Sequence, residues 1–209
     1  MVRHRLVRSL AVLGAGALVL TACGGDSDDD ASGTAEPDGD GGATEIVTGT
    51  GVTEEPCPDA VNEDNGCIYL GVISDLSIGA FASYGPEIVR GHEDFWQRVN
   101  EAGGIAGYDI DVSENIRDGE YDPQVYPQVY REIEPNILAL AESLGTPQTQ
   151  AILSDMEADN VVGATSTWWS GWGFEEDDQG LVLEAGSSYC LHSMSALDWV
   201  SENLSLIHI

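Results

Sequence analysis

Residues 68–73 read Ile-Tyr-Leu-Gly-Val-Ile, a continuous apolar run that decides the fold class. A run of this length is typical of a parallel strand that is buried on both faces. It is followed by a polar loop of small residues, 74–83, and then by a segment, 85–102, whose apolar residues recur at helical spacing. Gly103 and Gly104 supply the stop signal for that helix. The sequence therefore predicts a first β-α unit.

Further strand and helix signals alternate along the chain. Strands are predicted at 108–112, 137–140 and 161–164, and helices at 123–133 and 146–156. Strands that are separated by helical segments of this length require crossover connections, which favour a parallel sheet. The predicted fold class is therefore α/β, a doubly wound parallel sheet with flanking helices.

The chain begins like an exported protein. Residues 1–22 combine a basic start with an apolar stretch that is too short to span a bilayer, the pattern of a secretory signal peptide. Positions 20–23, Leu-Thr-Ala-Cys, resemble the bacterial lipobox, which implies cleavage before Cys23 and a lipid anchor at the outer face of the cell membrane. The alternative is an ordinary signal with a chance cysteine. Residues 23–55 are rich in Gly, Asp, Ser, Thr and Glu and predict a disordered acidic tether.

The charge of the chain limits its partners. The formal net charge is −30, and every basic residue is an arginine. Beyond the signal peptide only four arginines remain, at positions 90, 98, 117 and 131. A binder of nucleic acid needs a basic face, which these four residues cannot build, so nucleic acid is excluded as a partner. Direct docking on anionic lipid is excluded by the same argument.

Three cysteines lie beyond the lipobox. Cys57 and Cys67 flank a polar segment just before the first predicted strand, and in an oxidising compartment the pair is expected to form a local disulfide. A metal site would need further Cys or His nearby, and the sequence has none there, so neither a metal nor another cofactor is expected. Cys190 is left over, which indicates a buried thiol or a partner elsewhere.

The C-terminal residues break the pattern of the chain. Residues 204–209, Leu-Ser-Leu-Ile-His-Ile, resemble a translated adapter tail, and the alternative is a genuine short apolar terminus. We therefore exclude them from fold reasoning. The resulting division is a ligand-binding lobe at 56–192 and the start of a crossing into a second lobe at 193–203.

Two loops at the predicted carboxyl edge of the sheet carry hydrogen-bonding groups, and ligands of such sheets bind at this edge. In the first loop, Thr146 is a candidate N-cap and Pro147 suits the first helical position, so the free N–H groups there attract a carboxylate. The second loop, 165–167, offers the hydroxyls of Thr165, Ser166 and Thr167. Without further context a plain capped helix start is the favoured interpretation of the first loop, and the second is only a polar loop.

A longer stretch resembles a known family. Ser83-Tyr84-Gly85, then Gly91, then residues 99–107 (Val-Asn-Glu-Ala-Gly-Gly-Ile-Ala-Gly) are similar to the opening of the leucine/isoleucine/valine-binding family of ABC-transporter receptors. The resemblance implies a periplasmic-binding-protein type I fold of two lobes, with a small ligand held between them and an ABC permease as partner.

By position, the resemblance also implies roles for several residues. Thr146 matches the residue that receives the ligand's carboxylate, Thr165 to Thr167 match the loop that takes its ammonium and backbone, and Tyr84 matches an aromatic wall. Gly145 and Pro147 depart from the small polar residues that are more usual in the family. The implied function is delivery of an amino acid or a similar small polar solute to a permease.

Three tryptophans follow the second loop: Trp168, Trp169 and Trp172. They predict either an aromatic wall for the ligand or a loop that packs against the protein itself.

Two other functions compete with solute delivery. A ligand sensor of the same fold remains open. An exported enzyme would need a base, for which only His92 and His192 are available, and the chain has no recognisable nucleophile or metalloprotease motif.

Overall fold

The computed structural model describes residues 46–174 and 179–203. The predicted signal peptide, Cys23 and the tail at 204–209 lie outside the described residues. Within the described residues, no helix has the length and apolar character needed to cross a membrane.

The strand β2 (Gly66–Ser74) is the centre of the sheet, as the sequence predicts. Along one edge it pairs in parallel with β3 (Tyr108–Asp111) and then with β4 (Ile116–Asp118). Along the other edge it pairs with β5 (Ala139–Ser143), which continues the sheet to β6 (Gly163–Thr165). The edge strand β7 (Val182–Leu183) completes a mainly parallel sheet of seven strands in the described part of the chain.

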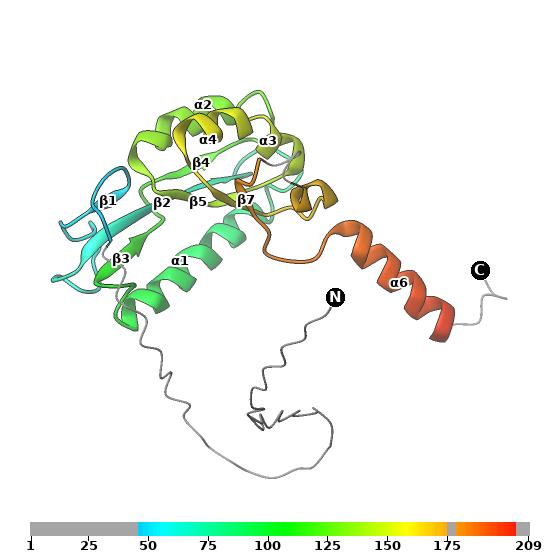
Figure 1. Cartoon of the computed structure of the whole chain (residues 1–209), viewed down its shortest axis with the longest axis horizontal. Helices are drawn as coiled ribbons and strands as arrows, with labels where there is room; N and C mark the ends of the chain where they lie inside the picture. The colour runs from blue at the N-terminus through cyan, green and yellow to red at the C-terminus, as the bar shows by residue number, and fades with distance from the viewer. Residues whose placement is uncertain (1–45, 175–178, 204–209) are drawn as a thin grey trace, which may run out of the picture. The chain divides into compact units, whose positions relative to one another are not determined.

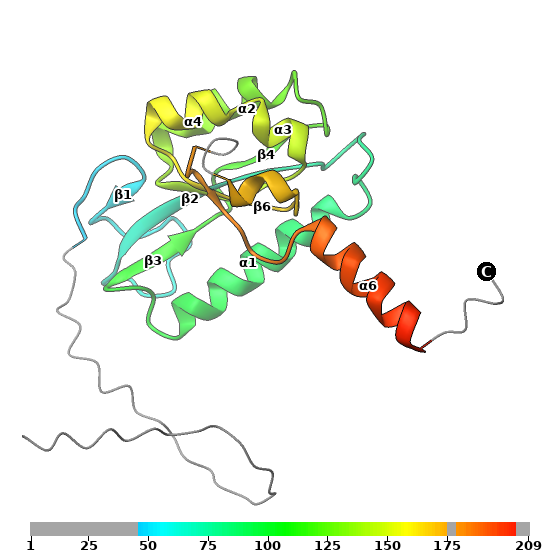
Figure 2. The ribbon, with the colours of Figure 1, turned by 45° about the vertical axis from the view of Figure 1, so that its right-hand side comes forward.

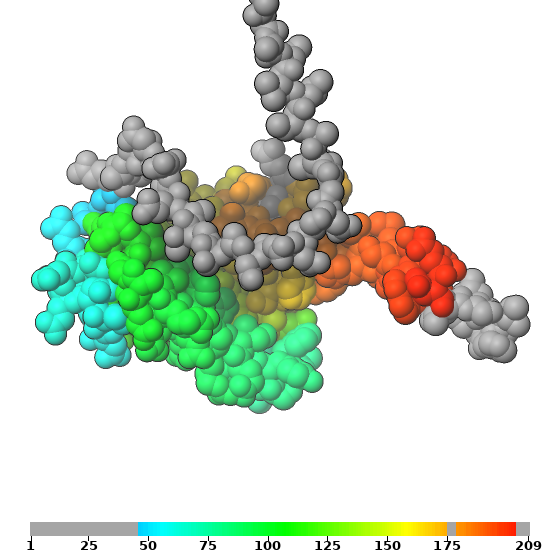
Figure 3. Space-filling view, turned by 90° about the horizontal axis from the view of Figure 1, so that it is seen from below, coloured from blue at the N-terminus to red at the C-terminus, as the bar shows by residue number. Residues whose placement is uncertain are grey.

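Helices cover both faces of this sheet. The helix α1 (Gly85–Glu101) lies on one face, and its outer surface is turned to the viewer in Figure 3. The other face carries α2 (Tyr126–Ile133), α3 (Thr146–Gln150) and α4 (Leu153–Asp159), as Figures 1 and 2 show. The larger core cluster joins β2 and β5 to this second layer and includes the buried Tyr126, Tyr130, Ile133, Ile152 and Met156. The predicted α/β fold with flanking helices is confirmed.

The boundaries differ from the prediction where polar residues are buried. The strand predicted at 137–140 extends to Ser143, because Glu142 and Ser143 are buried inside β5 although their side chains are polar. The helix predicted at 146–156 is two helices, because the chain turns at Ile152, whose ψ is −2°. This turn lets Ile152 and Leu153 both enter the core.

The helix predicted at 123–133 begins only at Tyr126. Pro127 therefore takes the early helical position, which has no need of a backbone N–H donor. A 3-10 turn, η1 (Glu134–Asn136), follows it. The short strands β4 and β7 were not predicted, because two or three residues are too few to show a period.

The end of the predicted tether is ordered. Within residues 46–55, β1 (Val52–Thr53) pairs antiparallel with β2, and Val52 is buried against Ile68 and Ile110. The structure thus shortens the predicted tether of 23–55 at its C-terminal end, because these few apolar residues find a face of the sheet to cover.

Two constraints attach the following segment to the sheet. Cys57 and Cys67 form the predicted disulfide. The buried Asp109 on β3 accepts hydrogen bonds from the backbone N–H groups of Val61 and Asn62, both at 2.9 Å, and from the side-chain amide of Asn65 at 2.8 Å. These bonds lower the pKa of Asp109 although burial alone raises it.

The described chain ends in α6 (Tyr189–Asn203), which has no buried residue. Its exposed apolar side chains are Leu191, Met194, Leu197 and Trp199. Cys190, also on α6, is an exposed free thiol. A 3-10 turn, η2 (Ser170–Gly173), lies between β6 and β7.

We predict that the double substitution Cys57→Ser and Cys67→Ser lowers the free energy of unfolding by about 2–3 kcal/mol, because the disulfide restrains the unfolded chain. Urea titration of the full-length protein measures this. Cys190→Ser is the matched control and should leave the midpoint unchanged, since Cys190 is exposed and unbonded. Equal midpoints for the double variant and the control would contradict the prediction.

Candidate functional site

The site is expected where the order of the strands reverses. The chain leaves β2 toward β3 and β4 on one side, and returns through α2 to β5 on the other side. The crossovers therefore diverge at the carboxyl ends of β2 and β5, and ligands of open α/β sheets bind at such a point. The loops that follow these strands, with those after β4 and β6, meet along one edge.

Three hydroxyls form a row at this edge. The Oγ1 atoms of Thr146 and Thr167 lie 2.5 Å apart, and the phenolic oxygen of Tyr189 lies 3.5 Å from Thr167 Oγ1. Thr146 opens α3, Thr167 follows β6 and Tyr189 opens α6. The row thus combines three segments that are far apart in the sequence, and each hydroxyl can both donate and accept.

The expected capping role of Thr146 is not observed. Gly145 is the N-cap of α3 and Thr146 is the first helical residue, with no side-chain bond to the end of the helix. Gly145 has a φ of +103°, which L-residues rarely adopt, so a glycine suits this turn. The Thr146 hydroxyl is consequently directed to Thr167. Pro147 takes the early helical position that the sequence predicts, and it is exposed.

The other predicted site residues lie apart from the row. The Thr165 hydroxyl donates to the backbone carbonyl of Thr167 at 3.1 Å, and the Ser166 side chain bonds to Glu142 inside the sheet layer. Tyr84 is 64% exposed at the start of α1, in a shallow hollow that it shares with Phe81. Of these three, only Tyr84 is available on the surface, and its role stays a prediction.

The tryptophans divide between the two roles that the sequence left open. Trp168 is half-buried beside the row, where its ring meets Tyr189 edge-on with centroids 6.1 Å apart, and its carbonyl accepts the Tyr189 N–H at 2.7 Å. Trp169 packs edge-on against the buried Trp172 at 5.1 Å and joins the core. Trp168 therefore remains a candidate wall, whereas Trp169 packs against the protein.

Tyr121 is a site residue that the sequence did not reveal. Its ring lies against Phe81, with centroids 4.9 Å apart, and so close to Gly145 that a Cβ there would meet it at 2.8 Å. Burial raises the pKa of Tyr121, and the neighbouring Tyr189 and Asp75 add to this, so its hydroxyl stays protonated and can donate. Tyr121 thus extends the row on its β4 side.

The backbone at Tyr121 is strained. Glu120 and Tyr121 have φ values of +52° and +51°, which non-glycine residues seldom adopt. Tertiary bonds hold this conformation. The Gln148 amide donates to the Tyr121 carbonyl at 2.7 Å, and the Asp118 carboxylate accepts the Glu120 N–H at 3.0 Å. Two non-glycine residues in this conformation cannot be read from sequence.

The loop after β2 is fixed by two carboxylates. Asp75 is buried and accepts the N–H groups of Gly79 at 2.9 Å and Phe81 at 2.6 Å. Asp118 accepts the Leu76 N–H at 3.0 Å and the Ser77 hydroxyl. These acids hold the loops in place, so they act as structural acceptors rather than as free carboxylates at the edge.

A buried polar cluster lies behind the row, on the α1 side of the sheet. Glu142 Oε1 accepts the Ser74 hydroxyl at 3.2 Å, while Oε2 has no hydrogen-bond partner and lies 3.5 Å from His92 Nε2. Burial raises the pKa of Glu142 to about 7, against which Ser74 and Ser166 act weakly, and burial lowers the pKa of His92. Both shifts favour the neutral forms. The sequence did not reveal Glu142 as a buried residue, because a charged residue after an apolar run normally indicates the end of a strand.

The described part of the chain offers no cation to this edge. Arg90, Arg117 and Arg131 pair with acids on the helices, namely Glu87, Glu132 and Asp155. Arg98 lies in the last turn of α1. Residues 46–174 and 179–203 also contain no group of three acidic, His or Cys side chains that is able to hold a metal ion. The groups that the described residues present at this edge are hydroxyls, backbone groups and aromatic rings.

We predict that Glu142→Gln stabilises the protein at pH 8 and leaves it unchanged at pH 4. The folded pKa of about 7 lies above the ordinary value of 4.5, so the folded state keeps its proton longer. Stability from this group is present below pH 4.5 and is lost as the pH rises through 7. The amide avoids that loss, which is about 1–3 kcal/mol.

Urea titration at both pH values measures the difference between variant and parent. Glu132→Gln, on the exposed surface of α2, is the matched control and should show a small difference at either pH. A Glu142→Gln difference that does not depend on pH would refute a raised pKa.

Comparison with known proteins gives the family. Residues 67–203 match the family described as periplasmic binding protein. Among solved structures, a fatty acid ABC transporter substrate-binding protein from Thermomonospora curvata is 26% identical with a TM-score of 0.61; the match covers 75% of this chain and 36% of that one. No curated protein matches the chain.

Two further structures share the fold at lower identity. A branched-chain amino acid ABC transporter protein from Thermus thermophilus with bound valine is 12% identical with a TM-score of 0.58, over 68% of this chain and 36% of that one. A solute-binding protein of an ABC transporter from Rhodopseudomonas palustris HaA2 in complex with p-hydroxybenzoic acid is 20% identical with a TM-score of 0.54, over 66% and 36%. This chain thus spans about a third of the length of the structures that it matches, and over the part that they share it belongs to the periplasmic binding protein family.

Proposed function

We propose that the chain is the ligand-binding lobe of an extracytoplasmic receptor that delivers an amino acid or a similar small polar solute to an ABC permease. The observation that carries the proposal is the hydroxyl row of Thr146, Thr167 and Tyr189 at the point where the strand order reverses. A ligand held there on one side is enclosed when a second lobe closes over it.

The chemistry of the row fits a carboxylate. Hydroxyls donate to carboxylate oxygens, and Tyr121, whose ring lies beside Gly145, adds a protonated phenol. Phe81, Tyr121 and Trp168 are suited to contact an apolar side chain of the ligand. Two of the proteins of this fold are in complex with valine or p-hydroxybenzoic acid, and a third belongs to a fatty acid transporter; these three kinds of molecule share a carboxylate.

In this proposal, the signal peptide and the lipobox place the receptor at the outer face of the cell membrane. Cleavage before Cys23 and attachment of lipid to its sulfur would tether the lobe to the outer face of the membrane through the acidic segment that precedes β1. A receptor that is anchored in this way can contact a permease in the same membrane. A sensor in place of a permease uses the same ligand site, so the two functions differ only in the membrane protein that responds.

We predict that Thr146→Val lowers the affinity for carboxylate ligands by about tenfold or more, because the substitution keeps the size of the side chain and removes one hydroxyl of the row. The measurement is a thermal-shift screen of amino acids, aromatic acids and fatty acids on the full-length exported protein, followed by calorimetric titration of the best ligand.

Thr50→Val is the matched control, because Thr50 is exposed near β1 and away from the row. Its affinity should equal that of the parent. Equal affinity of Thr146→Val and the parent would refute the assigned role of Thr146, whereas silence of the parent with every carboxylate would refute the ligand class.

We predict that Cys23→Ser releases the protein from the membrane fraction of the producing cell, since the lipid requires the cysteine sulfur. Immunoblots of membrane and soluble fractions measure this. Cys190→Ser should remain in the membrane fraction. Retention of the Cys23→Ser protein in the membrane would show that something other than this cysteine anchors the chain.

A further inference from the structure

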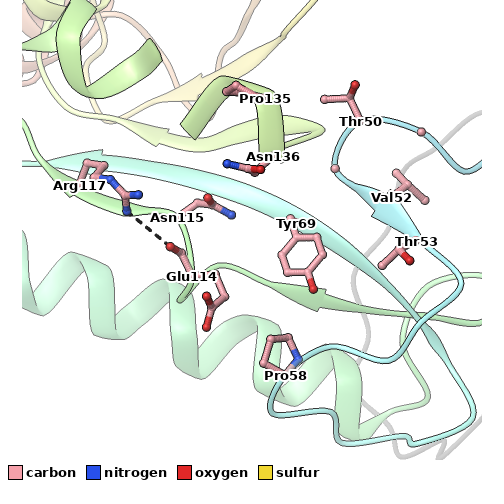
Figure 4. A pocket seen from close by; sticks show the side chains of 12 residues that line it. Thr50, Val52, Thr53, Pro58, Tyr69, Glu114, Asn115, Arg117, Pro135 and Asn136 are labelled. Carbon is pink, nitrogen blue, oxygen red and sulfur yellow. Dashed lines mark hydrogen bonds between the residues drawn. The ribbon is translucent and has the colours of Figure 1, made fainter. Parts of the chain in front are cut away.

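A second cavity lies at the opposite edge of the sheet, where β4 and β5 begin. Its volume is about 520 Å³, which falls within the range of about 300–1,000 Å³ that is typical of small-molecule sites. Five segments form its walls: the turn around β1, Pro58, Tyr69 of β2, the residues around the start of β4, and η1 (Figure 4). None of these residues belongs to the proposed ligand site.

Asn115 is the feature of this cavity that lacks an explanation in the fold. The residue is only 5% exposed and its backbone carbonyl accepts the Val72 N–H at 3.0 Å, but its side-chain amide has no hydrogen-bond partner among the described residues. The amide is not among the fully buried polar atoms that lack a partner, so it is open to the cavity, where water or a bound molecule satisfies it. Because Asn115 lines the cavity, a molecule in the cavity can be that partner.

Other uncharged groups lie beside Asn115. Figure 4 shows the Asn136 amide close by and the Tyr69 ring along the same wall, and neither the Tyr69 hydroxyl nor the Asn136 amide bonds to a described residue. Two amides and a phenol together present donors and acceptors in similar number. Such a set matches a ligand whose groups also donate and accept.

The charges at the cavity exclude strongly charged ligands. Arg117 is held by the Glu132 carboxylate at 3.2 Å and by the backbone carbonyl of Ile116 at 2.8 Å, so its positive charge is largely offset. Glu114 contributes a negative charge at the rim, and the chain as a whole carries −30. An anion is repelled, and no row of acids is present to attract a cation.

One wall of the cavity is closely packed. Gly51 has a φ of +69°, and a Cβ at this position would come within 2.0 Å of the backbone nitrogen of Leu138. Pro58 and Pro135 form parts of the rim. A wall that is packed in this way loses little conformational entropy when a ligand binds.

We propose that this cavity binds a neutral sugar, a mono- or disaccharide. Two adjacent ring hydroxyls match the NH2 donor group and the carbonyl acceptor of the Asn115 amide, and the apolar face of a pyranose suits the Tyr69 ring. The Tyr69 hydroxyl and the Asn136 amide bind further hydroxyls at the rim. This site is independent of the proposed transport ligand, because it lies at the other end of the strands.

Saturation-transfer NMR on the full-length protein tests the proposal with glucose, N-acetylglucosamine and their disaccharides as probes. We expect a signal from at least one probe, and a loss of affinity of about tenfold in Asn115→Leu. Tyr69→Phe keeps the ring and removes only the hydroxyl, so a several-fold loss is expected there even if Asn115→Leu fails to fold. Thr146→Val should bind the sugar as the parent does.

Three results would overturn the proposal. The first is the absence of a signal from every sugar, and the second is unchanged binding in Tyr69→Phe together with any folded Asn115→Leu. The third is loss of the sugar signal in Thr146→Val, which would place the sugar at the hydroxyl row. That last outcome would leave the row as a ligand site, so the two proposals fail separately.

Discussion

The parallel pairing of β2 on both of its edges is the constraint on which the rest of the structure depends. The strand is bonded to β3 and β4 on one side and to β1 and β5 on the other. Its backbone groups are therefore satisfied within the sheet, and its apolar side chains supply a core to both helical layers. Because β4, β5 and β6 run in the same direction as β2, the loops that follow these four strands emerge at one edge. The hydroxyl row is a consequence of that shared direction.

Buried acids and amides then fix the loops that the strands only position approximately. Asp75 and Asp118 each accept backbone N–H groups, and Gln148 donates to the carbonyl of Tyr121. Each hydrogen bond alone contributes about 1 kcal/mol to the stability of the fold, but a buried polar group that is left without a partner costs more. The bonds together therefore stabilise the strained conformation of Glu120 and Tyr121, which places the Tyr121 ring against Phe81. At this edge the aromatic pair is held by polar groups that bond to the backbone of Phe81 and Tyr121.

Sequence reasoning reached the elements that carry a long apolar pattern. Residues 68–73 predicted β2, because a strand that is buried on both faces has a continuous apolar run. The helical spacing after Gly85 predicted α1, because a helix that is buried on one side has apolar residues every three or four positions. The cysteine spacing likewise predicted the disulfide. Thr146 and Thr167 were named, and the structure brings them together. Trp168 and Trp169 were named without a distinction between them, because which of two neighbouring side chains faces the core depends on tertiary packing.

What sequence reasoning missed was decided by contacts between distant residues. Glu142 reads as a strand end, and only the serines of β2 and the β6 loop make its burial tolerable. Tyr121 needs a left-handed backbone that Gln148, 27 residues away in sequence, holds together with the local acceptor Asp118. Asn115 was also missed, because the cavity that it lines is formed by segments that are distant in sequence.

Tyr189 connects the site to the next part of the chain. Its hydroxyl contacts Thr167 and its N–H binds the Trp168 carbonyl, yet it is the first residue of α6, which has no buried side chain. The exposed Leu191, Met194, Leu197 and Trp199 of α6 form an apolar surface of the kind that marks a contact region. Completion of the row and packing of α6 are therefore coupled, because one residue belongs to both.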